Sequence, residues 1–200
     1  MSAVHRTATV VASGALALTV GLAGAPAALA DRVGDDPPEQ LGAELMARPY
    51  PTYSQGDRGY IVRAIQHMLI PTVDYDPGDG VFGVYTPHVT DAVRAWQEEN
   101  NGVPEHAEGK VETETWNMFR DWYGEVGRHS SGHKVSAAQS MLVERGYLDP
   151  DDIDGIFGGV TEDAVISFQE DTCTEGGEEC LVGDGWVGPL TFRALVTGGI

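Results

Sequence analysis

Carboxylates are the most abundant side chains in this sequence that could do acid–base or metal chemistry, because 31 of its 200 residues are Asp or Glu. The group Asp74, Asp76 and Asp79 suggests a calcium loop, since such loops place oxygen ligands at alternate positions. The closing Glu of an EF-hand is missing, however, because the twelfth position counted from Asp74 is Tyr85. The same count from Asp149 ends on a valine. We therefore expect no calcium site.

The histidines and possible nucleophiles also lack catalytic spacing. His129 and His133 are four residues apart, but a Ser-Ser-Gly segment separates them and no third ligand stands nearby. The sequence contains no Gly-x-Ser-x-Gly, His-Glu-x-x-His or Cys-His arrangement. Acidic pairs are so numerous that a glycosidase-like pair stays open. We expect a protein without enzymatic activity, metal or cofactor.

Residues 1–30 have the pattern of a signal peptide. A short basic start at Arg6 precedes an apolar run from about Ala8 to Ala25, and Ala28-Leu29-Ala30 forms a small-residue cleavage site. Gly, Ser and Thr interrupt the run, which is already near the short limit for a membrane span. We therefore expect a secreted protein, extracellular or associated with the cell wall, with no membrane attachment after cleavage.

The overall charge narrows the possible partners. The formal net charge is -19, which repels the phosphates of nucleic acid and anionic lipid headgroups. Five acidic residues and the pair Pro37-Pro38 stand in residues 31–53, which we expect to form an extended leader. In an exported protein, the lone pair Cys173 and Cys180 in one short loop is expected to form a disulfide.

The chain carries an internal duplication. The stretch Asp79-Gly80-Val81-Phe82-Gly83 returns as Asp154-Gly155-Ile156-Phe157-Gly158. Matching segments lie upstream at 62–69 and 135–142 and downstream at 109–116 and 185–192, with offsets between 72 and 76 residues. By this alignment the first copy has three extra residues between its Phe-Gly and the following helix. We predict a first repeat at 54–123, a linker at 124–128 and a second repeat at 129–198.

Each repeat has the pattern of three helices. Val62, Ile65 and Leu69 share one face at helical spacing, and later segments of both repeats show the same periodicity. Thr86-Pro87 and Pro189 are typical of helix starts. The predicted fold is all-α, with two tandem three-helix bundles, and the sequence leaves open whether they dock on each other.

The shared motif has mainly structural roles. Its glycines permit positive φ, its aspartates can close the turn, and its phenylalanines are expected in the core. These residues are Asp79, Gly80, Phe82 and Gly83 in the first copy and Asp154, Gly155, Phe157 and Gly158 in the second. Gln97 and Gln169 could tie the loops or contact a ligand. Tyr85 and Trp186 are outside the apolar helix faces, so we predict surface aromatics that stack on ligand.

These motifs together resemble the small three-helix peptidoglycan-binding domain found beside many bacterial cell-wall hydrolases. The resemblance rests on Gly56-Asp57-Arg58-Gly59, on Asp-Gly-x-Phe-Gly, on Thr-x-x-Ala-Val-x-x-Phe-Gln and on Asp-Gly-x-Val-Gly-Pro. It implies a three-helix bundle in each repeat and non-catalytic binding of peptidoglycan. The departures are Glu108 and Glu112 in the first repeat and His129-Ser130 in the second.

Two functions follow from this resemblance. The first is secreted, non-catalytic binding of peptidoglycan through both repeats, by either the glycan or the stem peptide. The second is an interaction or regulatory role in which the repeats bind a protein partner, such as a wall hydrolase. The high negative charge and the departures in the first repeat favour the second function, and the intact motifs of the second repeat favour the first.

Overall fold

The computed structural model describes residues 39–78, 82–101 and 108–199, which fold into seven α-helices and one 3-10 turn, with no strand among them. The prediction of an all-α protein is confirmed. The expected signal peptide at 1–30 lies outside the described residues. Within the described ranges, no helix is long and apolar enough to cross a bilayer.

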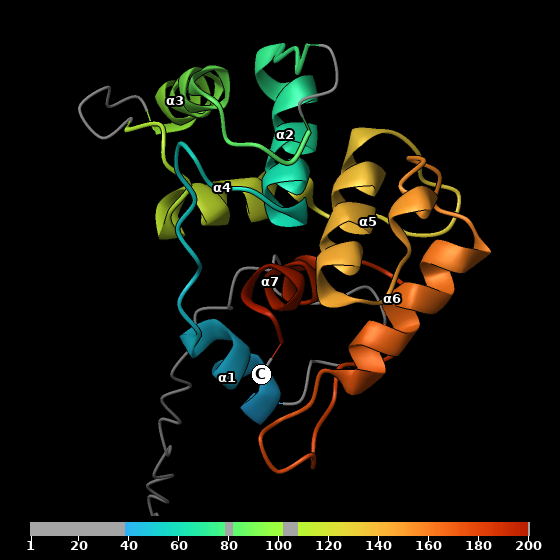
Figure 1. Ribbon diagram of the computed structural model, residues 1–200. Helices are drawn as coiled ribbons and strands as arrows, with labels where there is room; N and C mark the ends of the chain where they lie inside the picture. The colour runs from blue at the N-terminus through green and yellow to red at the C-terminus, as the bar shows by residue number, and fades with distance from the viewer. Residues whose placement is uncertain (1–38, 79–81, 102–107, 200) are drawn as a thin grey trace, which may run out of the picture.

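The helices follow the predicted order of two groups of three. The first repeat holds α2 (Tyr60–Val73), α3 (Pro87–Asn101) and α4 (Thr113–Tyr123), and the second holds α5 (His133–Arg145), α6 (Gly159–Asp171) and α7 (Pro189–Thr197). The 3-10 turn η3 (Pro150–Asp152) lies in the loop after α5. Figure 1 shows the two groups side by side, with α2 next to α5.

Helix ends follow local sequence signals. Pro189 is the first residue of α7, where its fixed φ fits the helix and its missing N–H is not needed. At the other end, Gly198 adopts a left-handed φ of 92° and donates its N–H to Ala194 O at 2.8 Å. The Thr86 hydroxyl caps α3 by accepting the N–H of Val89.

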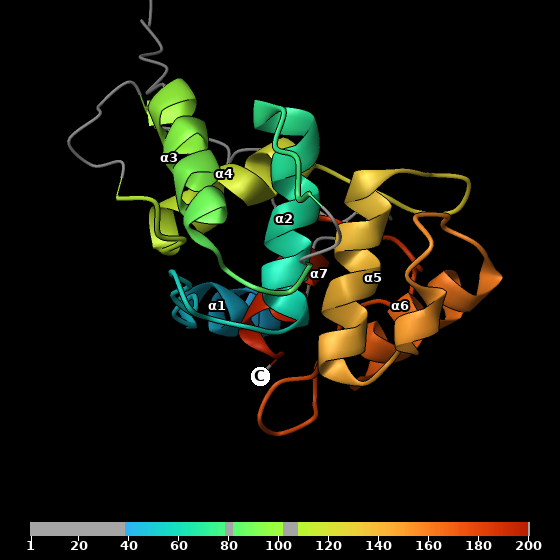
Figure 2. The same ribbon diagram turned by 45° about the horizontal axis from the view of Figure 1, so that its top comes forward.

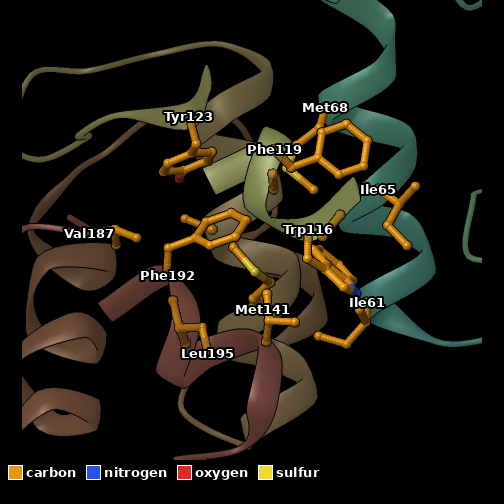
Figure 3. Packing of buried hydrophobic residues seen from close by; sticks show 14 of the residues in the cluster. Ile61, Ile65, Met68, Trp116, Phe119, Tyr123, Met141, Val187, Phe192 and Leu195 are labelled. Atoms are coloured by element: carbon orange, nitrogen blue, oxygen red, sulfur yellow. The ribbon is translucent and has the colours of Figure 1, made fainter. Parts of the chain in front are cut away.

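The two repeats share one core. Their buried apolar side chains form a continuous cluster, in which Trp116 and Tyr123 of α4 lie close to Phe192 of α7 (Figure 3). Trp116 and Phe192 occupy equivalent places in the two repeats, and their rings meet edge to face with centroids 6.3 Å apart. The repeats are therefore docked on each other.

Helices α2 and α5 form the centre of this docking and run antiparallel (Figure 2). The N–H of Tyr60, at the start of α2, donates to the Glu144 carboxylate near the end of α5 at 2.9 Å. Pro71, near the end of α2, lines one groove with His133, at the start of α5. Tyr60 corresponds to His133 and Pro71 to Glu144, each at an offset of 73 residues. Exchanging the two repeats therefore turns one pair into the other, which indicates an approximate two-fold axis between the repeats.

The expected extended leader is wrong for residues 39–47. Glu39–Ala47 form helix α1, and Leu41 and Leu45 are fully buried against α7. Arg193 of α7 donates from Nε to Leu45 O at 2.6 Å and from its terminal nitrogen to Met46 O at 2.9 Å. Arg193 also lies over the Tyr50 ring, 4.2 Å from its centroid. The acidic composition had indicated an extended segment, but residues 39–47 form a short helix whose C-terminal carbonyls are capped by the buried Arg193.

Residues 124–128, the predicted linker, pack against the second repeat. Val126 and Gly127 are buried, and Val126 pairs with Val187 through backbone hydrogen bonds of 3.2 and 2.8 Å. Tyr53 and Val111 make the equivalent pair in the first repeat, with hydrogen bonds of 3.0 and 2.8 Å. Each repeat thus begins with a short extended segment that pairs with its last loop.

The predicted disulfide between Cys173 and Cys180 is present. It closes the loop after α6, and Leu181 and Thr172 pair across the base of that loop with an N–O distance of 2.9 Å. Glu179 in this loop accepts the backbone N–H of Leu41 at 3.1 Å. The loop therefore also holds the start of α1.

Candidate functional site

The loop between α6 and α7 is held by one buried glutamine. Gln169 is fully buried, and its Oε1 accepts the N–H of Gly185 at 3.0 Å. Its Nε2 donates to Asp184 Oδ1 at 2.8 Å, to Trp186 O at 2.9 Å and to Thr191 Oγ1 at 3.1 Å. Asp184 Oδ1 also accepts the N–H of Trp186 at 2.8 Å, which closes the turn.

The loop between α5 and α6 repeats this arrangement thirty residues earlier. Gln139 Oε1 accepts the N–H of Gly155 at 2.8 Å, and its Nε2 donates to Asp154 Oδ1 at 2.8 Å. The same Nε2 lies 3.2 Å from Ile156 O and 3.1 Å from Thr161 Oγ1. The hydrogen bonds from Gln139 and the Ile156 N–H lower the pKa of Asp154, so this carboxylate stays charged while it holds the turn.

In the first repeat Gln97 is the counterpart of Gln169, and it ties its loop without the hydrogen bond to an aspartate carboxylate. Gln97 accepts the N–H of Gly109 at 3.0 Å and donates to Lys110 O and Thr115 Oγ1, both at 2.8 Å. Its loop carries glutamates in place of the Asp and Gly of the second repeat. A groove of about 490 Å³ beside Gln97 is lined by Glu108, Glu112, Glu114 and Lys110, among others. The equivalent region of the first repeat is therefore strongly acidic.

The loop between α2 and α3 shows that the sequence alignment was shifted. Gly83, not Gly80, is the counterpart of Gly155, because Gly83 donates its N–H to Gln66 Oε1 at 2.6 Å. Gly83 O accepts the N–H of Gly59 at 3.0 Å, and Gly155 O likewise accepts the N–H of Gly132 at 2.8 Å. With this correspondence the first repeat has one extra residue before Gly83, because Gly83 follows Gln66 by 17 positions and Gly155 follows Gln139 by 16, and it has none between Gly83 and α3. Asp79 and Gly80 are outside the described residues.

This correction changes the expected roles of two aromatic residues. Phe82 takes the place of Asp154 and is half-buried, where it stacks on His67 with centroids 4.6 Å apart. Tyr85 takes the place of Phe157, and both are buried. Because Tyr85 is only 1% exposed and its hydroxyl donates to Gly109 O, the prediction that it is a surface aromatic is wrong. Burial raises the pKa of Tyr85, which keeps its hydroxyl protonated as a donor.

All four loops present one side chain outward and bury the next. Ile156 is 60% exposed, whereas the following Phe157 is 2% exposed. Trp186 is half-buried beside the fully buried Val187. We call the first of each pair the outward position; it is held by Val84, Lys110, Ile156 and Trp186. The glutamine ties fix the backbone at this position, so each outward side chain has a defined place.

A short segment joins the two loops of the second repeat. Residues 126–132, which we call the strap, pair at one end with Val187 and at the other with Ile156 and Phe157. A Cβ on Gly127 would lie 2.4 Å from the Trp186 indole, so the absence of a side chain there allows the ring to pack on the strap.

An ion pair lies beside Trp186. Arg128 of the strap contacts Glu162 at the start of α6, with 2.8 Å between NH1 and Oε2. The Arg128 side chain is 56% exposed and that of Glu162 is 22% exposed. We call Trp186 together with the Arg128–Glu162 pair the Trp186 face, and Ile156 lies at the other end of the strap, where it pairs with Ser131. The Trp186 face combines exposed apolar surface with a charged pair able to donate and accept hydrogen bonds, a combination that suits a polar ligand with apolar faces.

The structure favours the loop-tie role for Gln97 and Gln169. They are 6% and 0% exposed, and both amide groups bond within the protein. Trp186 remains a candidate for ligand contact because part of its ring is accessible. Ile156 and Arg128 are not among the ligand-contact residues predicted from the sequence. The thirty-residue spacing that relates Ile156 to Trp186 was the signal that could have found Ile156.

Comparison with known families supports the sequence resemblance for the second repeat. A family model described as "Putative peptidoglycan binding domain" matches residues 131–195, which include both loops of the second repeat. The first repeat was not detected by this model, and no catalytic domain was identified. No curated protein and no solved structure matches the chain.

Proposed function

We propose, from the premise that residues 131–195 are a domain of the peptidoglycan-binding family, that this protein is exported and binds cell-wall peptidoglycan without cleaving it. The observation that carries the proposal is the Trp186 face. Glu162 and Trp186 belong to the matched domain, Arg128 comes from the strap, and the Gln169 tie holds the loop that carries Trp186. An indole ring gives apolar contact to the carbon-bound faces of a sugar, and the Arg128–Glu162 pair offers hydrogen bonds to its polar groups.

The first repeat has a different role in this proposal. Its outward positions carry Val84 and Lys110 instead of Ile156 and Trp186, and glutamates surround Lys110. Its aromatic residues Trp116 and Phe119 are buried in the shared core. The first repeat therefore supports the second repeat structurally, and we place wall binding mainly on the second.

The test is co-sedimentation of the purified protein with insoluble peptidoglycan stripped of teichoic acids, at low and physiological salt. Trp186→Ala is expected to weaken binding by about tenfold or more, as for a central aromatic contact, and Trp186→Phe by less. Gly127→Ala keeps the indole but displaces it from the strap, so it is expected to weaken binding as well. Met46→Ala, at an exposed residue of α1, is the control and is expected to bind normally.

The outcomes separate this function from a protein-binding role. Retention in the pellet at both salt concentrations, with loss in Trp186→Ala, supports wall binding. Equal binding by wild type and Trp186→Ala contradicts the Trp186 face as the site. Wild-type protein that stays in the supernatant at both salt concentrations contradicts wall binding. The acidic groove of the first repeat would then favour a partner with a basic surface, such as a secreted hydrolase.

A further inference from the structure

A groove lies at the junction of the two repeats and is lined in part by the strap. Its volume is about 340 Å³, within the range of small-ligand sites. Pro71 and Trp122 line it from the first repeat, and Val126, Ser130 and Ser131 line it from the strap. The groove exists only because the repeats are docked, and it shares the strap with the Trp186 face.

The charges in this groove differ from those of the rest of the protein. The chain has a net charge of -19, yet none of the described residues lining the groove is acidic. Lys134 provides a cation, with its Nζ 4.3 Å from the centroid of the Trp122 ring. The same Nζ donates to the backbone carbonyls of Trp122 and Tyr123 at 2.9 and 2.8 Å.

The position of Lys134 makes it a suitable partner for an anion. Burial lowers its pKa, which reflects an ammonium group that has lost part of its hydration. A carboxylate next to the Lys134 ammonium would replace the water that the ammonium has lost with a charged hydrogen-bond acceptor. The hydroxyls of Ser130 and Ser131 line the same groove and can donate hydrogen bonds to the carboxylate. Trp122, Val126 and Pro71 supply an apolar wall for a small side chain next to the carboxylate.

We infer that this groove binds the carboxylate end of a peptide whose last residue is small and apolar, with the carboxylate at Lys134 and the apolar side chain against Trp122 and Val126. The inference rests on the proposed function, because a peptidoglycan stem peptide has this chemistry at its free end. It divides recognition in two: the Trp186 face contacts the glycan, and the groove contacts the stem peptide. The first repeat then contributes to binding through Pro71 and Trp122.

The test titrates the full protein with a soluble N-acetylated peptide ending in D-alanyl-D-alanine and, separately, with the same peptide as its C-terminal amide. Binding is followed by NMR shifts of the Trp122 and Trp186 indole N–H signals. The free acid is expected to shift the Trp122 signal with little effect on Trp186. The amide is expected to bind about tenfold more weakly, the effect of losing one charge pair in a partly desolvated site.

A matched pair of variants tests the groove without disturbing the strap. Pro71 is exposed and has no backbone N–H to lose, so Pro71→Glu and Pro71→Gln differ only in charge. Pro71→Glu is expected to weaken binding of the free acid by about tenfold relative to Pro71→Gln, because it places a negative charge at the rim. Co-sedimentation with peptidoglycan shows whether the Trp186 face still works in both variants.

The outcomes are distinct. Preference for the free acid together with loss in Pro71→Glu supports the groove as a carboxylate site. Equal binding of acid and amide, or equal binding by the two Pro71 variants, overturns it. No binding of the peptide by a protein that still co-sediments with peptidoglycan overturns the groove inference and leaves the proposed function standing. Failure of both measurements removes the proposed function as well.

Discussion

Trp116 and Phe192 occupy the same position in the two repeats and pack against each other at 6.3 Å between ring centroids. Both side chains are fully buried, and they lie where the approximate two-fold axis passes between α4 and α7. A domain of about 70 residues buries a modest fraction of its unfolded surface, so each repeat gains stability from this shared core. The repeats are therefore expected to unfold together.

Phe192→Ala should destabilise both repeats at once. Loss of a buried phenylalanine costs about 3–5 kcal/mol, and the cavity would open into the first repeat beside Trp116. Urea unfolding should show one transition at a lower midpoint, with tryptophan fluorescence and circular dichroism coinciding. Ile156→Ala, at an exposed side chain, serves as the control and should change stability little. Two separate transitions in the wild type would contradict the shared core.

Gln169→Leu should loosen the loop that carries Trp186. Leucine has a similar size but leaves the Gly185 N–H without its buried acceptor and removes the donor to Asp184 Oδ1 and Thr191 Oγ1. The expected cost is about 2–4 kcal/mol, from one or two unsatisfied groups. Urea unfolding measures the loss, and faster hydrogen exchange at Gly185 would locate it. Gln55→Leu, at an exposed residue, is the control and should change neither the unfolding free energy nor the exchange rate at Gly185. An unchanged exchange rate at Gly185 in Gln169→Leu would contradict the role of Gln169 in holding the loop.

His67 should make the stability of the docked repeats depend on pH. It is 7% exposed between Phe82 and His133, and neither ring nitrogen has a hydrogen-bond partner. Burial, then Arg63 on α2 and His133 on α5, lower the pKa of His67 to about 3. Between pH 6.5, the pKa of His67 in the unfolded chain, and about pH 3, its pKa in the folded protein, His67 is protonated in the unfolded chain but not in the folded one. Stability is therefore fully present above about pH 6.5 and falls as the pH drops.

His67→Phe keeps the stacked ring and removes this titration. The wild type should lose about 2–3 kcal/mol more than His67→Phe between pH 7 and pH 4, measured by urea unfolding at each pH. His129→Asn keeps a residue that tolerates positive φ at an exposed position, and it should follow the wild-type pH dependence. Parallel pH profiles for the wild type and His67→Phe would show that His67 is hydrated in the folded protein.

The sequence predicted the fold class, the helix order and the disulfide, because these depend on local periodicity and on one cysteine pair. Alignment of the two repeats by residue identity placed one loop in the wrong register, because Asp79-Gly80-Val81-Phe82-Gly83 resembles the motif Asp154–Gly158 of the second repeat. The hydrogen bond from Gly83 to Gln66 shows that spacing from the helix, rather than identity, determines the correspondence. In the correct register Tyr85 aligns with Phe157, and its burial follows directly.

Other features depended on contacts between distant segments. Helix α1 is only nine residues long, and it is held by Arg193, 148 residues away from the Leu45 carbonyl in sequence. The docking of α2 on α5 buries apolar faces that each repeat could equally have covered alone. The Trp186 face also depends on the strap, whose Gly127 gives no periodic signal. Such long-range contacts leave no pattern in a single sequence.

The bonds from Arg193 to the end of α1 impose an order on folding. Helix α1 is among the first described segments to be synthesised, but its carbonyl end is bound by Arg193 of α7, and its apolar residues Leu41 and Leu45 pack against that helix. A nascent chain therefore carries an unfinished amphipathic segment until α7 has been made. Closure of the N-terminal helix onto the C-terminal helix is thus a late step, and a chain cut short before Arg193 would leave α1 undocked and open to proteolysis.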